Sequence, residues 1–354
     1  MKKIKIFIKN LLFALLFLGI GIFITINSKT ISAGAKNGLS ICFNVIIPSL
    51  FIFMVFSSFS KKTGIIDSFG KLISPFTKIV MKADEKLSGA IFLSMIGGYP
   101  VGGKVFSEMV KNKEIDLALC ERILPFCINA GPSFLISSVG VLMYGSLKVG
   151  FFLYLSQVIT SILMIRIFLM FNPSTKKNSK NSFKKIETSV PNAFCEAVSE
   201  SVNSIIGLSG YIILFSAIIA VLKERGIKNK FFLSILEVTT GVINYQCHGE
   251  KGLDMILFLI SFSGISVIFQ VLSFFKEENI SASKLIFMKT LHGIGTVIVG
   301  NFLNLFFRVK NSEINLCHIS LPLNLYLNKI LLIIFLISLI IFSFSFKKRS
   351  YNKK

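Results

Sequence analysis

The sequence predicts an all-α membrane protein with about eight transmembrane helices, two shorter re-entrant segments and an internal repeat of inverted topology. Three observations indicate this fold: an apolar composition, apolar runs of membrane-spanning length, and two short interrupted segments at matching places in the chain. Hydrophobic residues make up 53% of the 354 positions and charged residues only 16%, and the mean hydropathy is +0.74. Soluble domains are less apolar than this. The length of the chain therefore reflects membrane spans and not globular domains.

Eight apolar runs come close to the length of about 20 residues that a helix needs to cross a hydrocarbon core. They cover residues 11–27, 39–59, 123–144, 147–171, 203–222, 254–275, 285–307 and 328–346. The first run follows several lysines and is longer than the apolar region of a typical secretory signal, so we expect it to stay in the chain as a membrane anchor.

Two shorter apolar stretches, residues 87–103 and 231–245, do not fit ordinary spans. The first ends in a run of glycines around Pro100, which we expect to interrupt a helix because glycine is flexible and proline lacks an N–H donor. If both stretches are re-entrant, the basic linker and both termini fall on the cytoplasmic side, as the positive-inside rule favours. Residues 64–80 carry apolar side chains at helical spacing, which predicts either a helix in the membrane interface or an amphipathic connector.

The chain divides into two halves that resemble each other. Residues 48–53 align with 210–215, residues 61–65 with 223–227, residues 92–97 with 236–241, and residues 129–134 with 262–267. Each half has an odd number of crossings, so the second copy is expected to be inverted, an architecture typical of secondary transporters. The predicted regions are an N-terminal anchor (1–37), a first repeat (38–171), a basic cytoplasmic linker (172–202), a second repeat (203–307) and a C-terminal helix with a basic tail (308–354).

Several function classes are excluded or disfavoured by composition. Lys and Arg outnumber Asp and Glu by 39 to 17, but the positive residues fall between apolar runs and lack the interleaved aromatics of a nucleic-acid platform. The six cysteines form no C-x-x-C pair, and neither a phosphate loop nor a Ser-His-Asp grouping is visible. We therefore expect no enzyme, no metal or other cofactor and no nucleic acid as a partner. The lipid bilayer is the expected partner, and the oligomeric state stays open.

The candidate site residues lie beside the expected helix breaks, where free backbone groups must face protein, water or a ligand. Glu237 precedes the Thr239-Thr240-Gly241 break, and an acid inside the membrane indicates a ligand-hydroxyl acceptor or a proton or sodium site. The alternative is a glutamate at the membrane interface. His292 is interpreted either as a proton relay or as a histidine bonded between helices. The further candidates for solute binding are Gly97, Gly98, Tyr99, Pro100, Asn129, Ser133, Thr239, Thr240, Ser263 and Ser266.

For some of these candidates a structural role competes with solute binding. Asn129 is favoured as a functional hydrogen-bonding group. Ser133, Ser263 and Ser266 can bind a solute or serve as the small residues that let helices pack closely in lipid, and the packing role is favoured for them. The Gly97 to Gly103 run either presents backbone N–H groups to a solute or forms a structural tip.

Five motifs in this order resemble a known family: Pro48-Ser49-Leu50-Phe51, Gly97-Gly98-Tyr99-Pro100-Val101-Gly102-Gly103, Asn129-Ala130-Gly131-Pro132-Ser133-Phe134, Glu237-Val238-Thr239-Thr240-Gly241 and Ser263-Gly264-Ile265-Ser266-Val267. Together they resemble the YlbJ-type sporulation integral membrane proteins, from about Gly38 to Phe307. The resemblance implies the nucleoside-recognition or Gate domain that occurs in concentrative nucleoside transporters, ferrous-iron permeases and spore-maturation proteins. It also implies a role in endospore formation. The lack of a GTPase domain in this sequence argues against an iron permease.

The expected function is transport of a small polar solute, nucleoside-like, across the cell membrane of a sporulating cell, coupled to H⁺ or Na⁺. The alternative is a membrane protein that does not transport but organises, or signals to, the assembly of the spore cortex or coat. A shared domain does not by itself identify a ligand.

Overall fold

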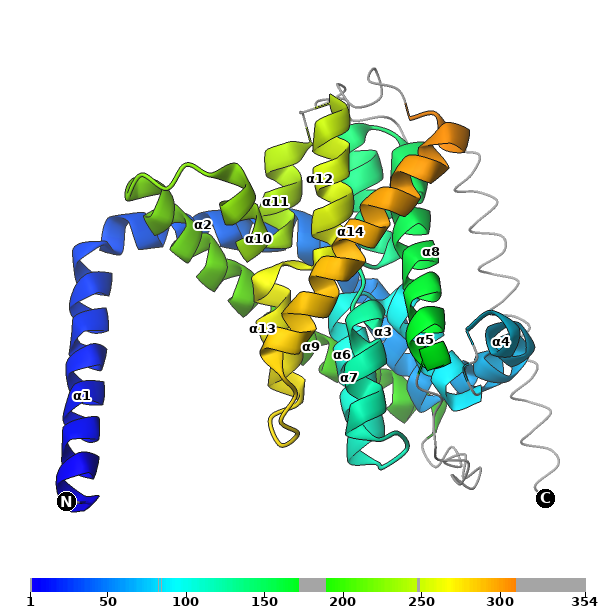
Figure 1. Ribbon diagram of the computed structural model, residues 1–354, viewed down its shortest axis with the longest axis horizontal. Coiled ribbons are helices and arrows are strands. Elements are labelled where there is room, and N and C mark those ends of the chain that lie inside the picture. The colour runs from blue at the N-terminus through cyan, green and yellow to red at the C-terminus, as the bar shows by residue number, and fades with distance from the viewer. Residues whose placement is uncertain (1, 82, 84, 172–188, 247–248, 310–354) are drawn as a thin grey trace. The chain divides into compact units, whose positions relative to one another are not determined.

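The computed structural model describes residues 2–81, 83, 85–171, 189–246 and 249–309. All regular structure in these residues is helical (Figure 1). Five of their helices are long and apolar enough to cross a membrane: Ser28–Lys62, Leu147–Met170, Val190–Glu224, Gly252–Phe274 and Ala282–Phe307. The predicted all-helical architecture with membrane spans is therefore confirmed. The predicted run 11–27 overlaps the shorter apolar helix Asn10–Ile26. The run 123–144 is not one continuous helix, because the chain is non-helical at residues 128–131 before the shorter apolar helix Ser133–Met143. Run 328–346 lies outside the described residues.

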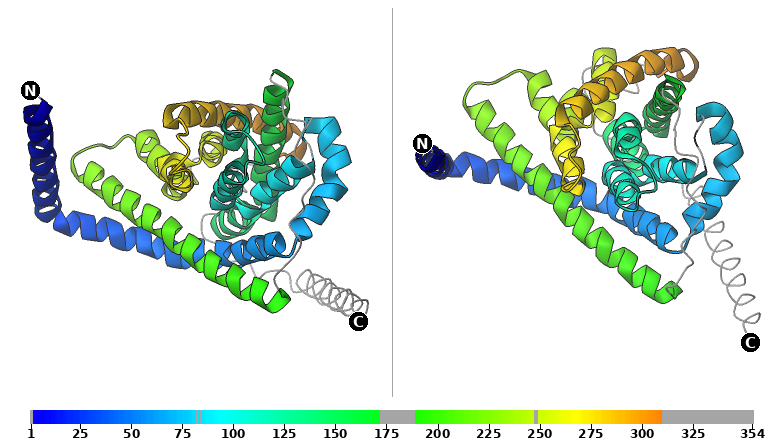
Figure 2. Two further views of the ribbon diagram at one scale, coloured as in Figure 1. Left: turned by 90° about the horizontal axis from the view of Figure 1, so that it is seen from below. Right: turned by 60° about the horizontal axis from the view of Figure 1, so that its bottom comes forward.

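The first helix, α1 (Lys2–Ile26), stands apart from the other described helices in both views of Figure 2. Its apolar side chains are exposed along most of its length, as lipid contact requires. Polar contacts hold its C-terminal end. The Asn27 amide donates to Phe23 O over 2.7 Å and accepts from Arg225, whose guanidinium lies 5.8 Å from the Phe23 ring centroid.

Two helices of 35 residues pack against each other along one side of the fold (Figure 2). The first consists of α2 (Ser28–Ile41), the π-helical turn η1 (Cys42–Ile46) and α3 (Ile47–Lys62), and the second is α9 (Val190–Glu224). The π-helical turn lies where Pro48 would clash with the carbonyl of Asn44 in a regular α-helix. The two helices run antiparallel, because Gly34 contacts the backbone of Ala217 near one end and Lys62 pairs with Glu196 at the other.

Both long helices end in the same way. Gly64 (φ 67°) and Gly226 (φ 85°) adopt the left-handed conformation that glycine tolerates best. Their N–H groups donate to Lys61 O over 3.2 Å and to Lys223 O over 3.1 Å. The sequence alignment of the two halves pairs these two glycines.

A pair of short helices follows each long helix. In the first half, α4 (Ile65–Met81) precedes α5 (Glu85–Gly97) and α6 (Tyr99–Lys111), which Gly98 alone separates. In the second half, α10 (Lys230–Leu236) and α11 (Val238–Tyr245) are separated by Glu237. The amphipathic helix expected at 64–80 is thus present as α4. Its predicted place in the membrane interface stays a prediction.

The interruption expected within the Gly97 to Gly103 run is present at Gly98 (φ 82°), and Pro100 occupies the first turn of α6, where its missing donor costs nothing. The position expected for the second break is wrong. The second break lies at Glu237 and not at Thr239-Thr240-Gly241, which belong to α11. The break forms where the Glu237 side chain caps α11, and the flexible Gly241 is helical.

An interrupted helix and a straight helix complete each half. In the first half, α7 (Leu117–Cys127) and η2 (Ser133–Met143) flank the non-helical residues around Asn129, and α8 (Leu147–Phe171) follows. In the second half, α12 (Gly249–Phe262) and α13 (Gly264–Phe274) flank Ser263, whose φ is 77°, and α14 (Ala282–Phe307) follows. The breaks expected beside Asn129 and Ser263 are confirmed. Loops 112–116 and 275–281 lie at one end of these helices, and loop 225–229 at the other (Figure 1).

Candidate functional site

The helix interruptions of each half pack directly against each other. In the first half, a Cβ atom built on Gly98 would stand 3.3 Å from the Gly131 nitrogen. In the second half, a Cβ atom on Gly264 would stand 2.9 Å from the Val238 nitrogen. Gly98 and Gly264 also have positive φ angles, so glycine is required at both places for conformation and for space.

Two hydrogen bonds join the pair of breaks in one half to the pair in the other. The Tyr99 hydroxyl donates to Ile260 O over 2.8 Å, and the Ser263 hydroxyl donates to Ile128 O over 3.2 Å. Both acceptors are carbonyls at the end of an interrupted helix, where the next turn no longer supplies a donor. Four interruptions from distant parts of the chain therefore meet in one region.

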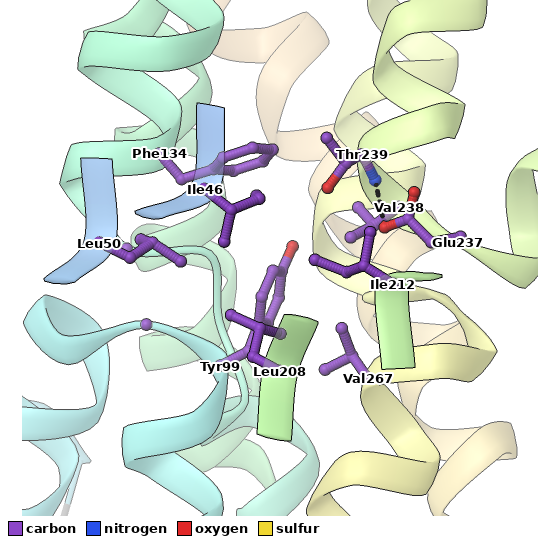
Figure 3. Close-up of a pocket in the computed structure, with 12 residues that line it drawn as sticks. Ile46, Leu50, Tyr99, Phe134, Leu208, Ile212, Glu237, Val238, Thr239 and Val267 are labelled. Carbon is purple, nitrogen blue, oxygen red and sulfur yellow. Dashed lines mark hydrogen bonds between the residues drawn. The ribbon is translucent and has the colours of Figure 1, made fainter. Parts of the chain in front are cut away.

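A small cavity lies at this meeting point (Figure 3). Its volume is about 20 Å³, which is room for about one water molecule. Apolar side chains of the two long helices form much of the wall, and the Tyr99 hydroxyl points into the space between them (Figure 3). A nucleoside-sized solute would need a wider state of this region. The lining residues are Ile46, Leu50, Gly98, Tyr99, Gly131, Phe134, Leu208, Ile212, Glu237, Val238, Thr239 and Val267.

Glu237 is the acidic residue of the cavity wall, and only 1% of its surface is exposed. Its backbone is extended (φ −145°, ψ 121°), and its side chain caps α11. One carboxylate oxygen accepts from Thr239 N over 2.9 Å and the other from Thr240 N over 2.6 Å. The positive end of the α11 dipole stabilises the negative charge. Each oxygen keeps a free lone pair that can accept a hydrogen bond from a ligand.

A buried polar network lies beside the break between α7 and η2. The Asn129 amide donates to Phe126 O over 2.8 Å and to the Ser161 hydroxyl over 2.9 Å. The Ser161 oxygen lies 3.1 Å from His292 Nε2, and His292 Nδ1 lies 3.4 Å from Lys289 Nζ. Sequence reasoning named Asn129 and His292 but missed Lys289. Its position three residues before His292, within an apolar run, was a signal that could have found it.

The structure brings some of the predicted site residues to the cavity and leaves others outside its wall. Gly98, Tyr99, Glu237 and Thr239 line it. Asn129 and Ser263 donate hydrogen bonds to backbone carbonyls beside the break between α7 and η2. Gly97 and Pro100 lie near Gly98 in the chain but do not line the cavity. Three further residues are buried, and their hydroxyls have no hydrogen-bond partner in the described part of the chain: Ser133, Thr240 and Ser266.

Comparison with known proteins gives one informative relative. No family model and no solved structure matches the chain. The sporulation integral membrane protein YlbJ of Bacillus subtilis (strain 168) is 20% identical over 329 residues, and the match covers 81% of each chain. The resemblance that the sequence motifs predicted is therefore confirmed: over most of its length, this chain is similar to a sporulation integral membrane protein of the YlbJ type.

Proposed function

We propose that this protein is a transporter-like component of the cell membrane that binds a small polar, nucleoside-like solute during endospore formation. The observation that carries the proposal is the meeting of four helix breaks at a cavity that contains the buried carboxylate of Glu237. Interrupted helices in a membrane leave backbone donors and acceptors without partners, and lipid cannot satisfy them. Transporters use such breaks near the bilayer midplane to hold their substrates.

The order and direction of the helices fit the predicted inverted repeat and so support this proposal. Each half contains, in the same order, a helix of 35 residues, a pair of short helices, an interrupted helix and a straight helix, while α4 is an additional helix of the first half. The long helices of the two halves are antiparallel, as inversion requires, and both end in left-handed glycines at aligned positions, Gly64 and Gly226. The contact between Gly98 and Gly131 has its counterpart in the contact between Val238 and Gly264.

The cavity lies where the two repeats face each other. Its wall contains residues from both halves. Three pairs occupy positions that the sequence alignment relates: Ile46 and Leu208, Leu50 and Ile212, and Phe134 and Val267. Gly98 and Glu237, which separate the two short helices of each half, also line it. A site on the axis between two repeats can open to one side or the other when one repeat moves relative to its partner. Such a movement would also provide the space that the present cavity lacks.

The chemistry of the wall fits an uncharged solute that has hydroxyl groups. Glu237 can accept hydrogen bonds from hydroxyls, and apolar side chains such as Leu208 and Ile212 can contact a flat ring. The negative charge of Glu237 disfavours an anionic solute. A nucleoside combines a hydroxyl-bearing sugar with a flat base, and it carries no charge.

Transport is tested by uptake into proteoliposomes. The purified protein is reconstituted and supplied with radiolabelled uridine, adenosine or guanosine, and Glu237→Gln is measured beside it. We expect uptake above that of empty vesicles for at least one nucleoside, and none with Glu237→Gln. Asn229→Ala is the matched control, since Asn229 caps the neighbouring helix α10 from an exposed position. Uptake that is equal in protein-containing and empty vesicles would contradict the proposal.

The second candidate is a membrane protein that organises spore assembly without transport. The small and largely apolar cavity favours it, because the present conformation has no room for a solute. The role in sporulation itself is tested by deleting the gene in its own host. We expect normal vegetative growth and fewer heat-resistant spores. If Glu237→Gln restores spore formation fully in that deletion strain, the organiser role is favoured over transport.

A further inference from the structure

The two long helices are held together in different ways at their two ends. Continued without a gap, the sequence alignment of the two halves pairs the whole of Ser28–Lys62 with the whole of Val190–Glu224. Because the helices run antiparallel, equivalent positions of the two helices lie at opposite ends of the pair. The contacts at one end can therefore be compared position by position with the contacts at the other.

At one end, two glycines bring the helix backbones close together. A Cβ atom built on Gly34 would stand 2.8 Å from the Ala217 Cα atom, and one built on Gly38 would stand 2.8 Å from the Ile213 Cα atom. Neither distance leaves room for a side chain. Small residues allow helices to approach in this way, and the close packing that results is lost if the helices separate.

At the other end, the two positions equivalent to these glycines hold Glu196 and Glu200, and ion pairs replace the close contact. The Glu200 carboxylate accepts from the Ser58 hydroxyl over 2.8 Å and pairs with Lys62 over 2.8 Å and with Lys104 over 2.9 Å. Glu196 pairs with Lys62 over 2.8 Å. Two carboxylates of α9 thus bind α3 and α6 of the first half.

The charges at this ion-paired end are complementary between the halves. The first half contributes three lysines and Glu108, a net charge of +2, and the second half contributes two glutamates, a net charge of −2. The paired side chains keep between 21% and 50% of their surface exposed. Ion pairs of such exposed groups are weak, because water can hydrate each charge again after separation. This end can therefore open at a lower cost than the glycine end.

The cavity between the repeats lies between these two ends. Leu50 and Leu208 belong to its wall, and the ion pairs begin about two turns further along each helix. Met54 and Ile205, which lie in those turns, are apolar and buried. In the present conformation they separate the cavity from the ion pairs.

We propose that the ion-paired end is a gate, at which α9 separates from α3 and α6 and opens the cavity toward one side of the membrane. The glycine contact keeps the other end closed, so the long helices part about it. The proposal rests on the proposed function only where it treats this opening as the route of a solute. The opening itself is a property of the folded protein, and it can be measured without any solute.

The test measures how fast N-ethylmaleimide labels a cysteine placed in the cavity wall, Leu208→Cys, in the full-length protein in detergent. The reagent is uncharged and too large for a cavity of about 20 Å³, so the labelling rate reports opening. Mass spectrometry of peptides separates this site from the native cysteines. We expect Glu200→Gln to raise the rate about five-fold or more, because its contacts with α3 and α6 weaken together.

Glu108→Gln is the matched control. It removes the same charge from the same cluster, but it breaks the pair with Lys61 inside the first half, so the labelling rate should not change. A second labelling site, Ser216→Cys, lies against Gly38 at the glycine end and should stay slow in every variant. If Glu200→Gln does not accumulate, high NaCl is used to screen the ion pairs, and we expect it to speed the labelling of Leu208→Cys.

Three results would overturn the gate. They are labelling of Leu208→Cys that responds to neither Glu200→Gln nor high NaCl, an equal response to Glu108→Gln, and an equal rise at Ser216→Cys. Failure of nucleoside uptake together with the expected labelling would contradict the proposed function and leave the gate in place.

Discussion

The Tyr99 hydroxyl donates a hydrogen bond of 2.8 Å to Ile260 O, and it thereby joins the first helix break of one half to α12 of the other. Ile260 O has lost its intrahelical partner because the chain leaves the helix at Ser263. Gln157 Nε2 also donates to it over 2.9 Å. A tyrosine of the first half and a glutamine of α8 thus satisfy a free carbonyl of the second half.

We expect Tyr99→Phe to lower the free energy of unfolding by about 1 kcal/mol, because one hydrogen bond is lost while Gln157 still satisfies Ile260 O. Thermal melting in detergent measures the change. Tyr144→Phe is the control, since the buried Tyr144 hydroxyl has no hydrogen-bond partner among the described residues and its removal should cost nothing. Equal losses in both variants would contradict the role of the Tyr99 bond.

The packing of α6 against the end of α7 depends on Gly102. A Cβ atom built there would stand 2.2 Å from Cys127 O, a backbone atom that cannot move without shifting the helix break. We expect Gly102→Ala to lower the free energy of unfolding by about 1–3 kcal/mol or more and to reduce accumulation of the protein in the membrane. Gly207→Ala is the control, because no atom lies within 4 Å of the added group. It should be neutral or stabilise α9 by up to about 1 kcal/mol, and immunoblots of membrane fractions compare the two variants.

Sequence patterns predicted five long apolar helices and the breaks beside Asn129 and Ser263, because these depend on local features. Apolar runs identified the long spans, and the aligned glycines Gly64 and Gly226 both end helices as left-handed residues. The break at Ser263 was also expected, although its positive φ at a non-glycine residue could not be read from the sequence.

Errors arose where a tertiary contact decided the outcome. Glu237 ends α10 because its side chain caps the next helix, whereas the pattern pointed to the flexible Gly241, which is helical. Gly102 was interpreted as part of a helix break, but it provides a close approach to α7. Lys289 was missed because its partners, Ile128 O and His292, come together only in the folded chain.

The orientation in the membrane remains a prediction that rests on the distribution of positive charge. We expect reporter fusions after Asn10, Lys180 and Tyr351 to be cytoplasmic, and fusions after Gly145 and near Ser312 to be external. Gly145 lies in the chain between η2 and α8, and Lys180 follows α8 in the sequence, so one candidate span separates the two fusions. A paired alkaline phosphatase and green fluorescent protein assay distinguishes the two sides. If Lys180 and Gly145 report the same side, the proposed inverted repeat is wrong.

The most direct test of the site is Glu237→Gln. The glutamine oxygen can still accept from one of the two N–H groups of Thr239 and Thr240, but its amide faces the other donor, so one cap bond is lost. We expect the loss of this hydrogen bond to lower the free energy of unfolding by about 1 kcal/mol, so that the variant still inserts and accumulates. The charge and the acceptor strength are lost, and we therefore expect heat-resistant spore formation to fail although the protein is present.

Asn229→Ala separates a binding role of Glu237 from a purely structural one. Asn229 Oδ1 accepts from Phe232 N over 3.0 Å and caps α10, so the variant loses one cap bond of similar value away from the cavity. We expect Asn229→Ala to accumulate and to sporulate normally. Spore counts after heat treatment, set against immunoblots of the same cultures, measure both properties. If the two variants are equally defective, the acid acts only as a helix cap. If Glu237→Gln sporulates fully, the carboxylate is not needed and the organiser role is favoured over transport.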